Sequence, residues 1–179
     1  MKNIPTLQTA RLVLRPFEAS DASMVRTLAG DREVYETTTT IPHPYKEGMA
    51  EHWISTHQGD YDNDKGLHLA ITLKDGTLLG AIGFKFSLAN NRAEVGYWIG
   101  VPHWNQGFCT EALQAIIEFG FRTLGLHKIT ARHLLANEAS GRVLIKSGMW
   151  KEGELKDEVL KDGVFHTVAA YAIINGNQT

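Results

Sequence analysis

Cysteine, long apolar runs and a strong excess of either charge are all scarce in this sequence of 179 residues. Its single cysteine, Cys109, rules out an intramolecular disulfide and argues against a cysteine-based zinc site, which favours a reducing, cytoplasmic setting. No stretch approaches the roughly 18 apolar residues of a membrane span, and the N-terminus lacks the apolar core of a signal peptide. The net charge of −2 offers no basic field for nucleic acid or an anionic membrane. We therefore expect a cytoplasmic protein that binds neither.

Signatures of the best-known nucleotide and metal sites are also missing. Neither G-x-x-x-x-G-K-[ST] nor a G-x-G-x-x-G that follows a strand occurs, which excludes P-loop and dinucleotide folds. The eight histidines contain no H-E-x-x-H motif and no pair four residues apart, so no metal site is expected. What the sequence does have is a hydrophobic fraction of 43%, enough to bury a core in one domain over residues 1–179.

The most informative stretch is EVGYWIGVPHWNQGFCTEA, from Glu94 to Ala112. Apolar residues alternate through its first half, which predicts a strand with one buried face. From Gly107 onward the apolar residues recur with a helical period instead. A strand, a tight loop and a helix are the result. The loop presents free backbone N–H groups at a helix N-terminus, which is a favourable place for an anion such as a phosphate.

The rest of the chain alternates between strand and helix patterns without a repeat or a linker. The segment 31–45, with four threonines and two prolines, is expected to be irregular. Asp75-Gly76 and Asp162-Gly163 mark hairpins. Strands are predicted at 11–17, 67–73, 78–86, 94–101, 128–134, 149–160 and 164–174, and helices at 20–30, 46–58, 107–122 and 137–148.

Three segments of the chain, in this order, resemble the RimJ/RimL-type branch of the GNAT acetyltransferase superfamily. TARLVLRPFEASDA is similar to its opening T-x-R-L-x-L-R strand, AEVGYWIGVPHWNQGFCTEAL to its E-[IV]-G-Y-W…T-E-A segment, and NEASGRVLIKSGM to its N-x-x-S-x-x-V…K-x-G-F motif. The resemblance implies the acyl-CoA N-acyltransferase fold. This is an α+β architecture in which about four helices flank a mixed, mostly antiparallel twisted sheet of about seven strands.

The same resemblance implies acetyl-CoA as the cofactor, direct transfer of its acetyl group to an amine, and CoA as the product. By analogy, backbone N–H groups of the loop would receive the diphosphate, and the strand before it would pair with the pantetheine arm like an added strand. That pairing requires the strand at 128–134 to splay away. The implied cofactor-binding residues are Ile99, Gly100, Val101, Trp104, Asn105, Gln106, Gly107, Phe108, Cys109, Thr110 and Asn137.

Two catalytic residues follow from the resemblance. Glu94 matches the glutamate that deprotonates the amine, directly or through a water, although a strand-edge residue bound to a cation is the alternative. Asp157 and Glu158 are the reserve candidates for this base. Ser140 matches the motif serine and would protonate the leaving thiolate, with a simple helix-start hydroxyl as the alternative. A strand N–H between Ile99 and Val101 would polarise the thioester carbonyl.

Several positions depart from the family pattern. Asn105 and Gln106 stand where the branch has glycine and a basic residue, and Leu144 stands where many members carry the thiolate-protonating tyrosine. Asn137 would contact the pantetheine according to the resemblance, and a helix N-cap is an equally good interpretation of this residue. Cys109 occupies a small-residue position, and no histidine is placed by motif to activate it, so it is not expected to be a nucleophile.

The favoured acceptor is the N-terminal α-amine of a protein or peptide, of the ribosomal-protein type. A small-molecule amine, such as a polyamine, an amino acid or a drug, is the alternative substrate. An acetyl-CoA-binding sensor or assembly module without turnover is the alternative of another class, suggested by Asn105, Gln106 and Leu144. The expected acceptor walls carry no readable specificity code. A homodimer also remains open, with Trp98 or Trp104 as its interface if they are exposed.

Overall fold

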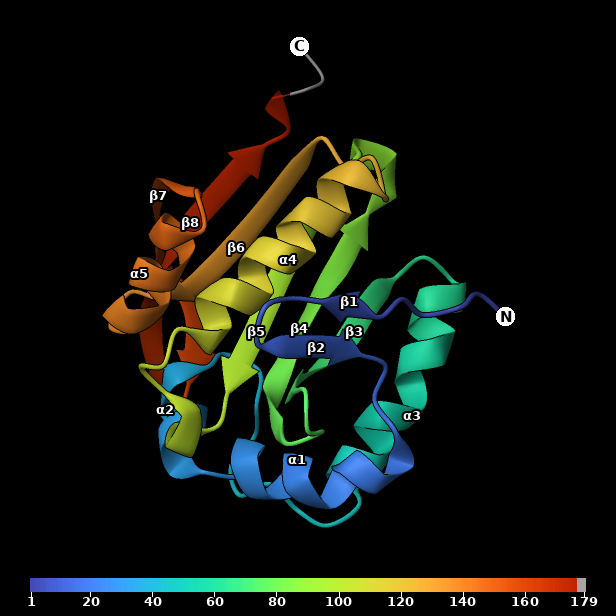
Figure 1. The fold of residues 1–179 in the computed structure, drawn as a ribbon. Coiled ribbons are helices and arrows are strands. Elements are labelled where there is room, and N and C mark those ends of the chain that lie inside the picture. Colours follow the sequence, from blue (N-terminus) through green and yellow to red (C-terminus); the bar gives the residue numbers. More distant parts are fainter. Residues whose placement is uncertain (177–179) are drawn as a thin grey trace.

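A computed structural model describes residues 1–176 and shows strands and helices close to those predicted (Figure 1). The helices are α1 (Ala22–Ala29), α2 (Arg32–Thr37), α3 (Met49–Asp62), α4 (Phe108–Arg122) and α5 (Glu138–Lys146). The strands are β1 (Leu7–Gln8), β2 (Leu12–Arg15), β3 (Gly66–Leu73), β4 (Leu78–Ser87), β5 (Arg92–Ile99), β6 (Lys128–Leu134), β7 (Trp150–Lys161) and β8 (Val164–Ile174). No helix within these described residues is long and apolar enough to cross a membrane.

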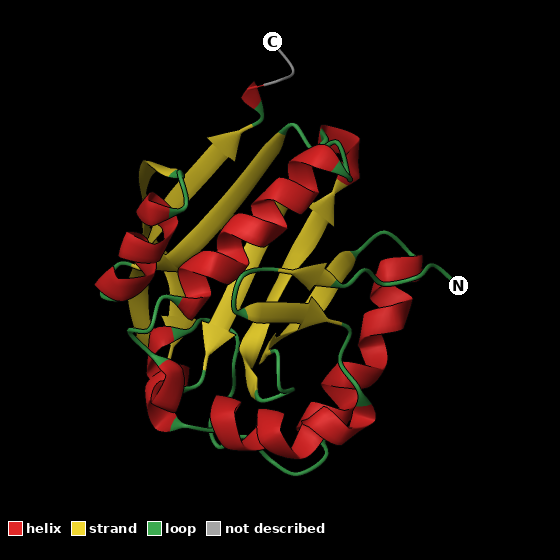
Figure 2. Ribbon diagram, viewed as in Figure 1, coloured by secondary structure: helices red, strands yellow, loops and turns green. Residues whose placement is uncertain are grey.

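The strands form one sheet in the order β1-β2-β3-β4-β5-β6-β8-β7. All neighbours run antiparallel except β5 and β6, which are parallel. A parallel pair needs a crossover connection, and α4 provides it by lying across the front of the sheet (Figure 2). The described residues thus contain one strand and one helix more than expected, because β1 has only two residues and α2 lies in the segment expected to be irregular.

Apolar side chains cover both faces of the sheet. Leu69 and Ile71 of β3 belong to a large cluster that includes the buried side of α4, whereas Ala70 belongs to a smaller cluster with α1 and α3. Alternating residues of a strand point to opposite faces, so the two clusters lie on the two sides of the sheet. Trp98 packs with the second cluster, while Trp104 packs against the first. Both indoles are half-buried, so neither is the exposed platform that the sequence suggested for a dimer.

The parallel pairing of β5 with β6 stops halfway along the strands. Register runs from Arg92 opposite Lys128 to Val95 opposite Ala131, and then ends. Beyond that point β6 stays paired with β8, through Leu134 opposite Val168, while β5 stays paired with β4, through Ile99 opposite Gly80. The C-terminal halves of β5 and β6 therefore diverge (Figure 1). This confirms that the strand at 128–134 splays away, and it leaves a gap that opens toward the start of α4.

The segment after α1 is more ordered than its composition predicts. Asp31 caps α2 by accepting a hydrogen bond from the Glu33 N–H at 2.8 Å. The carbonyl of Thr38, just past the helix, accepts a hydrogen bond from Lys161 at 2.9 Å, and the Tyr35 hydroxyl contacts both carboxylate oxygens of Asp162 at 2.7 Å. These contacts tie the α2 segment to the turn between β7 and β8.

Candidate active site

The loop before α4 has the backbone conformation of an anion-binding turn. Asn105 and Gly107 both adopt left-handed conformations, with φ of 59° and 79°, and Gly107 is the residue that precedes the helix. The first intrahelical bond runs from the Glu111 N–H to the Gly107 carbonyl at 3.1 Å. The N–H groups of the first turn have no carbonyl of the helix to bond, so they stay available to a ligand. The predicted loop therefore has suitable geometry for a phosphate group.

The backbone that faces the gap belongs to alternate residues of β5. The Gly100 N–H donates to the Leu79 carbonyl on the β4 side at 2.8 Å. Successive residues of a strand direct their N–H and C=O groups to opposite edges, so Tyr97 and Ile99 present theirs toward β6. The Ile99 carbonyl already accepts a hydrogen bond from the Trp104 indole at 2.6 Å. Within the predicted stretch 99–101, Gly100 thus does not face the gap, and Tyr97 takes a place that sequence reasoning missed.

Ser140 is joined across the gap by a tyrosine that sequence reasoning also missed. The Tyr97 hydroxyl lies 2.7 Å from Ser140 Oγ and 3.3 Å from the Ser140 carbonyl. Burial raises the pKa of Tyr97 above its ordinary value, and the nearby Cys109 adds to the effect. The phenol therefore stays neutral and able to donate a proton to a hydrogen bond. The hydroxyl of a buried tyrosine usually has a hydrogen-bond partner. This requirement is the signal by which the sequence could have pointed to Tyr97.

Both polar atoms of the Asn137 side-chain amide are hydrogen-bonded. Its Oδ1 accepts from the Ser140 N–H at 3.1 Å, which caps α5, and its Nδ2 donates to the Thr37 carbonyl at 3.0 Å. The N-cap alternative is therefore realised, and the side chain also links α5 to the α2 segment. Gly141 in the same helix lies against the His133 ring, because a Cβ there would approach Nε2 to 3.1 Å. Its absent side chain permits close packing of α5 on the sheet.

Glu94 lies on the opposite face of β5 from Tyr97, in an ion-pair chain that spans three strands. Arg132 of β6 donates to Glu94 at 3.0 Å and to Glu158 of β7 at 3.0 Å. Glu158 follows Asp157, which has a φ of 54° within a bulge where the β7 register shifts. The structure therefore brings together Glu94 and the reserve candidate Glu158, and it also realises the alternative in which Glu94 binds a cation.

Glu94 lines a cleft with a volume of about 480 Å³. Charged side chains from four strands line it: Lys85, Arg92, Glu94, Arg132 and Glu152. Cations outnumber carboxylates among these five. The cleft can thus receive a polar group beside a carboxylate, and its electrostatics disfavour a ligand with many positive charges.

Cys109, in the first turn of α4, is suited to packing more than to attack. Burial raises the pKa of its thiol to about 12, so the thiolate is scarcely populated at neutral pH. The helix N-terminus, which by itself favours a thiolate, does not offset the desolvation.

The sheet thus splays at the parallel pair of β5 and β6, and the N-terminus of α4 lies at the mouth of the gap. The protein-family model of the acetyltransferase (GNAT) domain matches residues 11–150 of this chain. The chain therefore belongs to the GNAT acetyltransferase family, and acetyl transfer is the chemistry of its class. It is 33% identical over 177 residues to the uncharacterized N-acetyltransferase YoaA of Bacillus subtilis, covering 95% of this chain and 97% of that protein.

Other relatives differ in the acceptors that their names state. The ribosomal-protein-serine acetyltransferase of Escherichia coli is 31% identical over 126 residues, covering 70% of this chain and 68% of that protein. A RimL ribosomal acetyltransferase in complex with coenzyme A shares the fold, with a TM-score of 0.86 at 18% identity over 95% and 98% of the two chains. So does a spermidine N-acetyltransferase of Vibrio cholerae in complex with CoA and spermine, with a TM-score of 0.80 at 20% identity over 93% and 97%.

Proposed function

We propose that this chain transfers the acetyl group of acetyl-CoA to a primary amine, and that the N-terminal α-amine of a protein or peptide is its main acceptor. The observation that carries the proposal is the gap between β5 and β6, which ends at the free N–H groups of α4. When bound, acetyl-CoA supplies a thioester-activated acetyl group. Everything else in the reaction falls to the residues around the gap.

The residues present fit this cofactor. The left-handed backbone at Asn105 and Gly107 exposes the N–H groups of the first turn of α4, which would hold the diphosphate. The N–H groups of Tyr97 and Ile99 face the gap, where an extended pantetheine arm would pair with them as an added strand. An N–H of this edge would also polarise the thioester carbonyl. Trp104, anchored on the Ile99 carbonyl, fixes the path from strand to loop.

Proton transfer is assigned to side chains on both faces of β5. Glu94, oriented by Arg132, accepts the proton of the acceptor ammonium directly or through one water. Ser140 Oγ, 2.7 Å from the Tyr97 hydroxyl, forms with it a hydroxyl pair that delivers a proton into the gap. Glu158 shares Arg132 with Glu94 and stays the reserve base. Neutral hydroxyls near the cofactor and carboxylates near the acceptor match the two opposite proton movements that the reaction needs.

The charge of the cleft favours an acceptor with a single amine over a polyamine. Lys85 and Arg92 would repel the further ammonium groups of a polyamine, whereas one amine beside Glu94 leaves these two cations available to carbonyls or carboxylates of a peptide. Relatives named for ribosomal-protein acetylation support the same choice. A small-molecule amine is the second candidate, supported by the fold shared with the spermidine enzyme.

An assay of CoA release tests the proposal against both alternatives. Acetyl-CoA is offered with peptides that begin with serine, alanine or methionine, with the same peptides blocked at the N-terminus, and with spermidine. We expect CoA release with free N-termini and only background hydrolysis with blocked peptides. CoA release with spermidine and with none of the peptides would favour a small-molecule amine as the acceptor. Calorimetric binding of acetyl-CoA without release in any mixture would indicate a sensor without turnover.

A further inference from the structure

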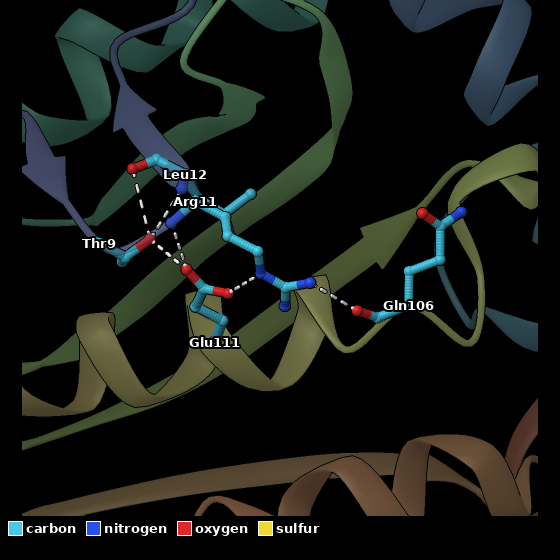
Figure 3. A network of polar contacts seen from close by, with 5 residues as sticks. All are labelled: Thr9, Arg11, Leu12, Gln106 and Glu111. Carbon is cyan, nitrogen blue, oxygen red and sulfur yellow. Dashed lines mark hydrogen bonds and ion pairs between the residues drawn. The ribbon is translucent and has the colours of Figure 1, made fainter.

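The turn between β1 and β2 is joined to the start of α4 by a network of hydrogen bonds (Figure 3). Glu111, in the first turn of the helix, accepts hydrogen bonds from Thr9 Oγ1 at 2.6 Å, from the Arg11 N–H at 2.8 Å and from Arg11 Nε at 2.6 Å. Partial burial opposes ionisation of Glu111, but these hydrogen bonds outweigh it and lower its pKa. Glu111 therefore stays ionised and has both oxygens engaged.

The Arg11 guanidinium reaches past Glu111 onto the loop itself. Its Nη1 donates to the Gln106 carbonyl at 3.0 Å, and its Cζ lies 4.6 Å from the centre of the Phe108 ring. Its Nη2 would lie 3.4 Å from a Cβ built on Gly107. The cation thus touches three successive residues of the loop before and at the helix start. Its side chain is 47% exposed, so it remains accessible to a ligand.

Gln106 itself adds no charge to this loop. Its uncharged amide turns back to donate to the Pro102 carbonyl at 3.1 Å. Figure 3 shows its side chain pointing away from Arg11. Without Arg11, the formal charge on the first turn of α4 would be that of the Glu111 carboxylate alone. This negative charge would repel an anion bound at the loop.

We propose that Arg11, contributed by the β1–β2 turn, is the cation of the diphosphate-binding loop, to which Gln106 adds no charge. It cancels the charge of Glu111, fixes the Gln106 carbonyl, and offers its outer N–H groups to a phosphate oxygen. This inference rests on the proposed binding of acetyl-CoA. It adds a ligand-binding residue about a hundred residues away in sequence from the loop.

Two variants isolate the cation from its structural contacts. Glu111→Gln keeps Arg11 and removes the carboxylate, whereas Arg11→Gln combined with Glu111→Gln removes both charges and leaves no unpaired carboxylate. By isothermal calorimetry, we expect the first to bind CoA at least as tightly as the unmodified protein and the second about tenfold more weakly. The affinity of the second should also fall less steeply between 50 and 200 mM salt. Thermal unfolding verifies that both variants fold.

Further comparisons separate charge on the loop from a general effect. Arg122→Gln, at the far end of α4, should leave CoA affinity unchanged, and Gln106→Lys should restore it to the doubly substituted protein. With S-acetyl-pantetheine, which lacks the diphosphate, both Glu111-based variants should have the same kcat/KM. Equal CoA affinity of these two folded variants would overturn the inference while the proposed function stands. Absence of acetyl-CoA binding by the unmodified protein would overturn both.

Discussion

The proposed cofactor side, at the gap between β5 and β6, and the proposed acceptor side, around Glu94 on the paired half of β5, are built from different chemical groups. On the proposed cofactor side, acetyl-CoA would meet backbone N–H groups, which are exposed by the left-handed residues at 105 and 107 and by the early end of the strand pairing. On the proposed acceptor side, an amine would meet the side chains of Glu94, Arg132 and Glu158, which come from three strands. The first surface depends on chain conformation, and the second depends on which charges happen to face one another.

This difference implies that the two sides respond differently to substitution. A loop made of backbone groups tolerates side-chain changes such as Asn105 and Gln106, because the donors are not altered, but it does not tolerate a change of conformation or of charge at its centre. A site made of side-chain carboxylates instead depends on the charge of the carboxylate that accepts the proton. We therefore expect glycine replacement to affect cofactor affinity, and glutamate replacement to affect turnover.

The largest effect is expected from Gly107→Asp. The new side chain adds a negative charge where the diphosphate would lie and strains a backbone with φ of 79°, so CoA affinity should fall by about a hundredfold or more. Calorimetric titration measures the loss. Gly76→Asp is the matched control, because Gly76 has a φ of 92° in a hairpin turn with no atom within 4 Å of its Cβ position. Unchanged CoA affinity in Gly107→Asp would mean that the loop does not hold the diphosphate.

The next effect tests the acceptor side through Glu94→Gln. Losing the proton acceptor should lower kcat by about a hundredfold, since general-base catalysis contributes about 10²–10⁴-fold, while the Kd for acetyl-CoA stays the same. Glu158→Gln is the matched control, because it removes the other carboxylate bound to Arg132. If Glu158→Gln abolishes turnover and Glu94→Gln does not, the base lies on the β7 bulge.

The same contrast explains which parts of the molecule could be predicted from the sequence. The span of β6, the Asn137 cap and the helix start after Gly107 follow from local signals, namely alternation, cap chemistry and a positive φ that glycine adopts. Helix α2 was missed because four threonines and two prolines obscure a six-residue helix whose cap, Asp31, is its clearest signal. Short β1 was missed because two residues carry no readable period.

Side-chain partnerships across the sheet were less accessible. Alternation predicted that Tyr97 points into the core, yet its partner Ser140 lies 43 residues away and depends on how far α5 stands from the gap. Arg132 is in a well-predicted strand, but its pairing with Glu158 requires the register shift of β7, which no local pattern announces. Backbone conformation was therefore more predictable than side-chain pairing, because conformation is encoded locally and pairing across the sheet is not.

Acidification should destabilise the folded protein through His57, which packs against Trp53 and His68. Burial lowers the pKa of His57 on α3 from 6.5 to about 3, with a further contribution from the stacked His68. Between these two pH values the unfolded chain binds a proton that the folded chain does not, so the free energy of unfolding falls as the pH falls. His57→Phe should remove this contribution of His57. Between pH 7 and pH 5, the free energy of unfolding of the unmodified protein should therefore fall by about 2 kcal/mol more than that of the variant.

Urea unfolding at the two pH values measures that difference. His52→Phe, an exposed position on the same helix, is the control and should leave the pH dependence unchanged. A parallel pH dependence in His57→Phe and the unmodified protein would show that His57 is not the group responsible.

The smallest effect is expected where the two sides of the gap meet, at the hydroxyl pair of Tyr97 and Ser140. Tyr97→Phe keeps the ring in its packed position and removes the hydroxyl with its contacts to Ser140 Oγ at 2.7 Å and to the Ser140 carbonyl at 3.3 Å, so Ser140 loses one partner but keeps its hydroxyl. We expect kcat to fall about fivefold, and about tenfold or more in Ser140→Ala, which removes the proposed proton donor itself. The double variant should be no slower than Ser140→Ala, because both residues act on one proton. Multiplicative losses would show that Tyr97 acts independently of Ser140, and would place its effect on the gap-facing edge of β5 instead.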